Sequence, residues 1–100
     1  MNAVKTILSI SQLNNQVKFL LENKFSHVWV EGEISSLRQY KSGHIYFTLK
    51  DFTSEISSVL FSHDAQKSAF IPENGQKVIV FGTVSLYSQR GQFQFIVKNL

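Results

Sequence analysis

Residues 44–50 alternate strictly between apolar and polar side chains, and this alternation constrains the fold of the chain more than any other feature. Ile45, Phe47 and Leu49 fall on one side of an extended segment, which is typical of a β-strand with one buried face. The outward side carries His44, Tyr46, Thr48 and Lys50. An outward stripe of aromatic, hydroxyl and amine groups is suited to contact with bases and phosphates, so the pattern points to a nucleic-acid-binding β-barrel.

Four further segments complete a set of five predicted strands. They cover residues 27–36, 55–61, 77–87 and 92–97. Gly32 and Gly82 interrupt the first and the fourth of the five strands, where a glycine allows a bulge or a sharp coil. In the last strand we expect Phe93, Phe95 and Val97 to face inward, because they recur at every second position.

An amphipathic helix is predicted before the first strand. The apolar residues that recur at helical spacing are Leu13, Val17, Leu20 and Leu21. Ser11 is a candidate N-cap, and the helix is expected to extend to residue 23 or 24 after an extended lead-in over residues 1–10. Because its apolar face needs a surface, we expect the helix to cover one end of the barrel, with Trp29 packed beneath it.

Five strands with glycines inside the first and the fourth describe an all-β, five-stranded Greek-key barrel of the OB-fold class, which we assign to residues 11–100. The connection between the third and fourth strands is longer than the others. It is expected to hold a short helical turn within residues 63–70, before the turn signal at residues 72–75.

The composition fits one globular domain with a preference for polyanions. The 100 residues are 43% hydrophobic and 17% charged, which suits a single core. The net charge is +3 and the pI is about 9.3, which favours nucleic acid as a partner. No apolar run approaches the ~18 residues of a membrane span, and no signal-peptide pattern follows Met1. A cytoplasmic protein without a membrane partner is therefore expected.

Candidate contacts come from the places where OB-folds bind oligonucleotides, which are the second and third strands and the loops after the first and fourth strands. Basic side chains there would neutralise phosphates, and aromatic rings would stack on unpaired bases. The candidates are Arg38, Tyr40 and Lys41 in the loop at 37–43, His44, Tyr46, Thr48 and Lys50 on the second strand, Phe61 on the third, and Tyr87 and Arg90 at the loop 88–91. Tyr46 and Phe61 are the preferred stacking platforms, although Phe61 could equally belong to the core.

The residues do not assemble into a catalytic or metal-binding group. Glu31 and Glu33 share one face of a strand, but no base and no closed pocket accompany them. The three histidines, His27, His44 and His63, fall on separate elements without ligand spacing. The chain has no cysteine, so thiolate metal sites and disulfides are excluded. We therefore expect no cofactor, no metal and no catalytic centre within residues 1–100.

Three segments carry a more specific pattern: SISQLNNQVKFLLE at 9–22, WVEGEIS at 29–35 followed by SGHIYFTLKD at 42–51, and GQKVIVFGTVSLYSQRGQFQFIV at 75–97. In this order they resemble the N-terminal domain of the large subunit of bacterial exodeoxyribonuclease VII. The resemblance implies an OB-fold that binds single-stranded DNA. It also implies a parent enzyme that hydrolyses single-stranded DNA to oligonucleotides, with several copies of a small subunit and a nuclease centre downstream of this domain.

Two other functions remain open. A transfer-RNA anticodon-binding module has a similar barrel, and RNA readers exploit the 2′-hydroxyl group. A protein-interaction barrel would instead use the aromatic face to dock a subunit, since one fold serves several kinds of ligand.

Overall fold

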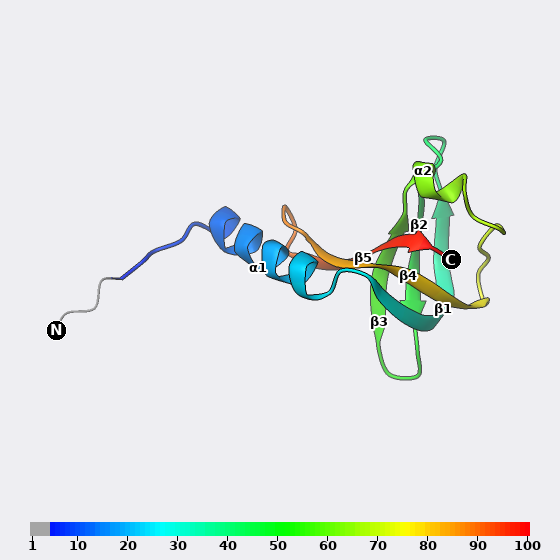
Figure 1. Cartoon of the computed structure of the whole chain (residues 1–100), viewed down its shortest axis with the longest axis horizontal. Coiled ribbons are helices and arrows are strands. Elements are labelled where there is room, and N and C mark those ends of the chain that lie inside the picture. Colours follow the sequence, from blue (N-terminus) through cyan, green and yellow to red (C-terminus); the bar gives the residue numbers. More distant parts are fainter. Residues whose placement is uncertain (1–4) are drawn as a thin grey trace.

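The chain forms a five-stranded barrel with a helix beside it, as described for residues 5–100 by a computed structural model (Figure 1). The elements are α1 (Ile10–Lys24), β1 (Val28–Gln39), β2 (Ile45–Lys50), β3 (Glu55–Leu60), α2 (Ser62–Ala65), β4 (Lys77–Tyr87) and β5 (Gln92–Asn99). The barrel is closed in the order β1-β2-β3-β5-β4, and β3 and β5 are its parallel pair. This topology confirms the predicted OB-fold, including the helix before β1 and the short helix after β3.

Alternate residues of all five strands fill the interior of the barrel. Ile34, Phe47, Leu60, Val80 and Phe95 come from five different strands, and each is at most 3% exposed. Burial of one such side chain contributes about 1.5–3 kcal/mol to folding. Because the core takes every second residue, the residues between them are left on the outside and are available to a ligand.

β1 takes part in two ladders. Its first half pairs with β4 and its second half with β2, so that Glu33 lies opposite Lys77 in one ladder and opposite Lys50 in the other. Gly32, where a sharp coil or a bulge was predicted, lies where β1 passes from its pairing with β4 to its pairing with β2. The bulge lies further along, next to Ser36, whose φ is 52°.

α1 lies beside the arm formed by the connected ends of β4 and β5, and it does not cover an end of the barrel (Figure 1). Asn14 Nδ2 donates to the Ser88 carbonyl oxygen at 2.8 Å, and Ser85 Oγ donates to Glu22 Oε2 at 2.5 Å. No residue of α1 is buried. The predicted cap is therefore wrong, because the arm extends beyond the barrel and offers the helix a different surface.

α1 is capped by Ser9 and not by Ser11. Ser9 Oγ accepts from the backbone N–H of Gln12, and the Gln12 side chain accepts in return from the Ser9 N–H. This reciprocal pair is a capping box, and it places Ser11 inside the first turn. Residues 5–9 precede α1 without regular structure, as expected for a lead-in, while residues 1–4 of the predicted lead-in lie outside the described residues.

Two aromatic side chains that were predicted to be covered are exposed. Trp29 is 64% exposed and contacts its neighbour on β4, Phe81, with 4.8 Å between ring centroids. Phe93 is 60% exposed, because it lies on the arm where no other strand closes over it. Phe95 and Val97 enter the core as predicted. Neither correction affects the outer side of β2, where most of the candidate contacts lie.

Candidate nucleic-acid interface

A row of predicted contact residues follows the outer face of β1 and β2. Tyr46, Thr48 and Lys50 alternate with core residues along β2, so their side chains leave the barrel on its outer side. Arg38 lies opposite Tyr46 in the β1–β2 ladder and shares its face. Arg38 belongs to the end of β1 and not to the loop, which corrects the predicted position. We call Arg38, Tyr40, Tyr46, Thr48 and Lys50 the outer row.

Tyr40 joins the outer row from the loop between β1 and β2. Its ring meets that of Tyr46 edge to face, with 5.3 Å between centroids and 89° between planes. The loop is ordered by two backbone hydrogen bonds, from the Tyr40 N–H to the His44 carbonyl oxygen at 3.0 Å and from the Gly43 N–H to the Tyr40 carbonyl oxygen at 2.9 Å. Gly43 has a φ of 92°, which favours glycine. The loop therefore holds Tyr40 in place beside Tyr46.

The middle of the outer row is a band of hydroxyl groups. Thr48 lies opposite Ser35 on β1 and opposite Ser57 on β3, and paired positions share a face of the sheet. Hydroxyl groups donate to phosphate oxygens without carrying a net charge. Ser35 was not predicted as a member of this band, because its pairing with Thr48 depends on the register that the bulge at Ser36 sets.

The cations of the outer row differ in how far their charge is compensated. Lys50 Nζ lies 3.5 Å from Glu33 Oε2, so part of its charge is balanced within the protein. The ion pairs found among residues 5–100 involve neither Arg38 nor the exposed Lys41 of the adjoining loop. Arg38 and Lys41 are therefore the stronger candidates for phosphate contacts.

His44 and Phe61 lie next to the outer row and are engaged with each other. His44 Nδ1 accepts from the backbone N–H of Ser62 at 2.9 Å, and its ring meets that of Phe61 edge to face with 5.2 Å between centroids. Phe61 is half-buried and is the N-cap residue of α2, so it lies just beyond β3. Both side chains fix the start of α2 against β2, and their contact with nucleic acid stays a prediction.

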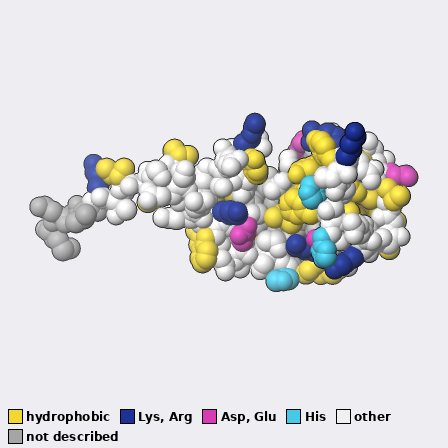
Figure 2. Space-filling model, turned by 90° about the horizontal axis from the view of Figure 1, so that it is seen from above, with side chains coloured by type: hydrophobic (Ala, Val, Ile, Leu, Met, Phe, Trp, Pro, Cys, Tyr) yellow, Lys and Arg dark blue, Asp and Glu magenta, His cyan; other side chains and the backbone are white. Residues whose placement is uncertain are grey.

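Tyr87 and Arg90 lie apart from the outer row, at the tip of the arm. This loop is beside α1, whereas the loop between β1 and β2 is next to α2 (Figure 1). The Tyr87 hydroxyl donates to Gln89 Oε1 at 3.0 Å. Seen from above, Lys and Arg side chains and hydrophobic side chains lie close together on the barrel, and further basic side chains occur on the part that extends to its side (Figure 2). The contacts predicted for Tyr87 and Arg90 would thus form a second, separate area.

The turn between β2 and β3 is fixed by Asp51. Its Oδ1 accepts from the backbone N–H groups of Thr53 at 3.0 Å and Ser54 at 2.9 Å. These two hydrogen bonds hold the pKa of Asp51 below its ordinary value, because they stabilise the charged carboxylate. The turn is therefore a rigid end to the hairpin at neutral pH.

The part of the chain that the structure describes shows no cluster of three or more His, Cys, Asp or Glu side chains able to hold a metal ion. Glu33 is paired with Lys50, and Glu31 lies on the neighbouring outward position of β1. Within the same residues, no helix is both long and apolar enough to cross a membrane. What the described surface offers to a ligand is a basic, aromatic and hydroxyl-bearing face.

The chain belongs to the family of OB-fold nucleic acid binding domains, whose sequence profile matches residues 8–100. Proteins named exodeoxyribonuclease 7 large subunit match nearly the whole chain, which confirms the resemblance. The protein from Geobacter metallireducens is 47% identical over 96% of this chain, and that from Cronobacter sakazakii is 41% identical over 95%. The chain spans about a fifth of these relatives, 21% of each.

Solved structures with low sequence identity share the fold. The S. pombe Stn1-Ten1 complex matches 73% of this chain and 54% of its own matched chain, with a TM-score of 0.60 and 21% identity. A putative aspartyl-tRNA synthetase from Leishmania major matches 98% of this chain and 20% of its own, with a TM-score of 0.58 and 16% identity. These similarities show the OB-fold barrel alone. The ligand has to be inferred from the residues of the outer row, because one fold serves several kinds of ligand.

Proposed function

We propose that this domain binds single-stranded DNA along the outer row, as the DNA-capturing part of an exodeoxyribonuclease VII large subunit. In the longer protein, a downstream nuclease part would hydrolyse the captured strand to oligonucleotides, and small subunits would associate outside residues 1–100. The names of the relatives support this assignment. The observation that carries it is the common face of Arg38, Tyr46, Thr48 and Lys50 on two paired strands.

The outer row would select single strands because it combines rings with separate cations. Unpaired bases expose flat faces that can stack on Tyr46 and Tyr40, and each such stack is worth about 1–3 kcal/mol. Arg38 and Lys41 would neutralise adjacent phosphates, and each phosphate contact would add about 0.7 to the salt slope for a single strand. A duplex keeps its bases stacked inside, so it would gain only the phosphate contacts. As part of the same proposal, we place the protein in the cytoplasm, where bacterial DNA lies.

Fluorescence anisotropy with labelled oligonucleotides tests the proposal. Single-stranded DNA, duplex DNA and RNA of matched sequence would be titrated at about 50 mM and about 200 mM salt. We expect single-stranded DNA to bind most tightly. Tyr46→Ala should weaken binding about five- to a hundred-fold at both salt concentrations, whereas Arg38→Ala should weaken it and also flatten the salt dependence.

Lys24→Ala is the charge-matched control for Arg38→Ala, because Lys24 is exposed at the end of α1, away from the outer row. It should leave the affinity almost unchanged. Preference for RNA over DNA would favour the anticodon-binding alternative. Binding that responds to neither Arg38→Ala nor Tyr46→Ala would remove the outer row from the DNA-binding surface.

A further inference from the structure

Phe52 is completely exposed, at 102% of its reference area, in the turn between β2 and β3. Among the large hydrophobic side chains of the described residues it is the most exposed. The turn itself requires only the Asp51 carboxylate and the backbone groups that it binds. The fold therefore gains nothing from a phenyl ring at this position, while burying such a ring against a ligand would contribute about 1.5–3 kcal/mol.

The turn holds the backbone that carries Phe52 in a fixed place. Besides the two hydrogen bonds that Asp51 Oδ1 accepts, the Asp51 N–H donates to the Ser54 carbonyl oxygen at 2.9 Å. Three hydrogen bonds across four residues leave little backbone freedom. A ring on a rigid support loses less conformational entropy on binding than a ring on a mobile loop, so its contact with a ligand yields more affinity.

Phe52 lies just beyond the outer row, in the turn that begins where β2 ends at Lys50. At about 3.3 Å per residue, the six residues from Tyr46 to Phe52 extend over at most ~20 Å. A single strand that stacks on Tyr46 and follows β2 would therefore reach Phe52 next.

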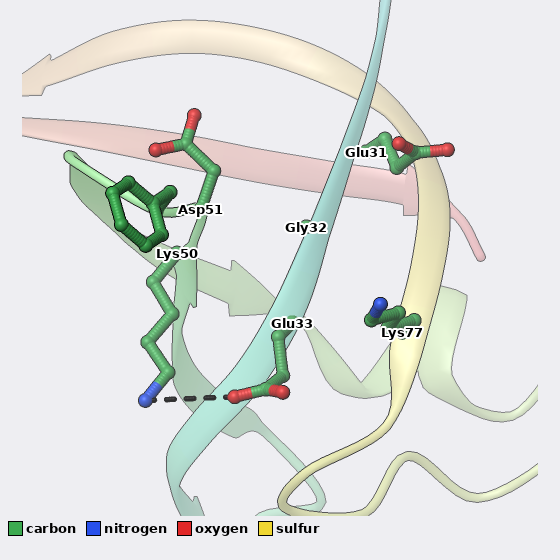
Figure 3. Close-up of a pocket in the computed structure, with 7 residues that line it drawn as sticks. Glu31, Gly32, Glu33, Lys50, Asp51 and Lys77 are labelled. Carbon is green, nitrogen blue, oxygen red and sulfur yellow. Dashed lines mark ion pairs between the residues drawn. The ribbon is translucent and has the colours of Figure 1, made fainter.

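A hollow of about 390 Å³ lies beside the ring, between the middle of β1, the end of β2 and the start of β4. It is lined by Glu31, Gly32, Glu33, Lys50, Asp51, Phe52 and Lys77. Lys50 and Glu33 point toward each other, and Lys77 lies on the other side of β1 from Lys50 (Figure 3). Its volume is at the small end of the range for ligand sites.

The charges around the hollow decide which part of a nucleotide it suits. The lining carries two ammonium groups, from Lys50 and Lys77, and three carboxylates, from Glu31, Glu33 and Asp51. A phosphate group gains no net attraction from such a set. An uncharged base can stack on the phenyl ring without that difficulty, because every base has a flat π-face.

We infer that Phe52 is a further stacking platform, which takes one unpaired base at the far end of the outer row and lengthens the single-strand site beyond Tyr46. This inference rests on the proposed function. The contact is one of stacking and not of charge, so its contribution to affinity is the same at low and at high salt.

The test measures the affinity of the 100-residue chain for single-stranded DNA of about 4 and about 12 nucleotides, at about 50 mM and about 200 mM salt. Phe52→Ala should weaken binding of the longer strand about five- to a hundred-fold, by the same factor at both salt concentrations. The shorter strand, which fits on Tyr46 and Tyr40 alone, should bind as before. Phe52→Trp should restore the affinity for the longer strand, since indole also stacks.

Phe19→Ala is the matched control, because Phe19 is a phenylalanine of α1 that is 65% exposed and lies away from the outer row. It should change neither affinity. The inference is overturned if Phe52→Ala binds the longer strand within about twofold of the unchanged chain while Tyr46→Ala weakens it. If the unchanged chain binds no single-stranded DNA at all, the proposed function fails first, and the two failures are thereby distinguished.

Discussion

At the scale of single residues, Gly82 shows how little room the barrel leaves. A Cβ atom at this position would clash with the Ile96 carbonyl oxygen and lie 3.1 Å from the Val97 Cα, and these backbone atoms cannot move without breaking the β4–β5 ladder. We expect Gly82→Ala to lower the free energy of unfolding by about 3 kcal/mol, measured by urea denaturation.

Gly32→Ala provides the comparison for Gly82→Ala. Its Cβ would lie 3.2 Å from the Lys50 carbonyl oxygen, a contact that a shift of a few tenths of an ångström relieves. The expected loss is about 1 kcal/mol. Equal losses for Gly82→Ala and Gly32→Ala would contradict the close approach of β4 and β5.

The carboxylate of Asp51 makes the stability of the turn depend on pH. Its pKa is lowered in the folded chain by the Thr53 and Ser54 backbone N–H groups, from an ordinary value of 3.8. A lowered folded pKa means that the stabilisation is complete above the unfolded value and is lost as the pH falls through the folded value. We expect Asp51→Ala to melt at a lower temperature than the unchanged chain at about pH 7, and the two melting temperatures to converge as the pH falls through the lowered pKa of the folded chain.

Asp51→Asn separates the charge from the geometry of the turn. Its amide oxygen can still accept from both backbone N–H groups, but it does not titrate in this range. Its melting temperature should therefore fall between those of Asp51→Ala and the unchanged chain at about pH 7. A constant difference between Asp51→Ala and the unchanged chain at all pH values would show that the carboxylate charge does not stabilise the turn.

At the scale of elements, α1 is joined to the arm by few polar contacts and contributes nothing to the barrel core. Replacing Asn14 and Glu22 by alanine removes the hydrogen bonds to Ser88 and Ser85. We expect faster hydrogen exchange of the α1 amides, with little change in β1, β2 and β3, because local opening does not require the barrel to unfold. Faster exchange throughout the barrel would show that α1 supports the core after all.

The strands could be predicted from the sequence because alternation is a local signal, and β4 was predicted at residues 77–87 as observed. The capping box was also present in the sequence, as Ser9 and Gln12, and would have placed the N-cap correctly. The exposure of Trp29 and Phe93 could not be predicted, because it depends on the arm and on where α1 packs. For the candidate site, alternation predicted the β2 residues, whereas the alignment of Arg38 with Tyr46 depends on the bulge at Ser36.

At the scale of the whole molecule, the described chain is elongated, with extents of 60 × 31 × 22 Å. The barrel carries the outer row, and α1 with the arm extends to one side (Figure 1). Tyr87 and Arg90 belong to this extension, so a strand that contacts both areas must cross from the barrel to the arm. Because the two areas lie apart, we expect their contributions to the binding free energy to be independent. The losses of binding free energy caused by Tyr46→Ala and Arg90→Ala should therefore add on a long single strand, as measured by anisotropy.

The proposed function divides binding from hydrolysis between this domain and the downstream nuclease part. The barrel interior is filled by side chains, and the Asp51 carboxylate is engaged in a turn. Glu31 and Glu33 line an open hollow, and Glu33 is paired with Lys50. We therefore expect the 100-residue chain to raise the anisotropy of end-labelled single-stranded DNA while gel electrophoresis shows the strand at full length. Shortened products that persist through repeated purification would place a nuclease centre within this domain and contradict the proposed role as the binding part alone.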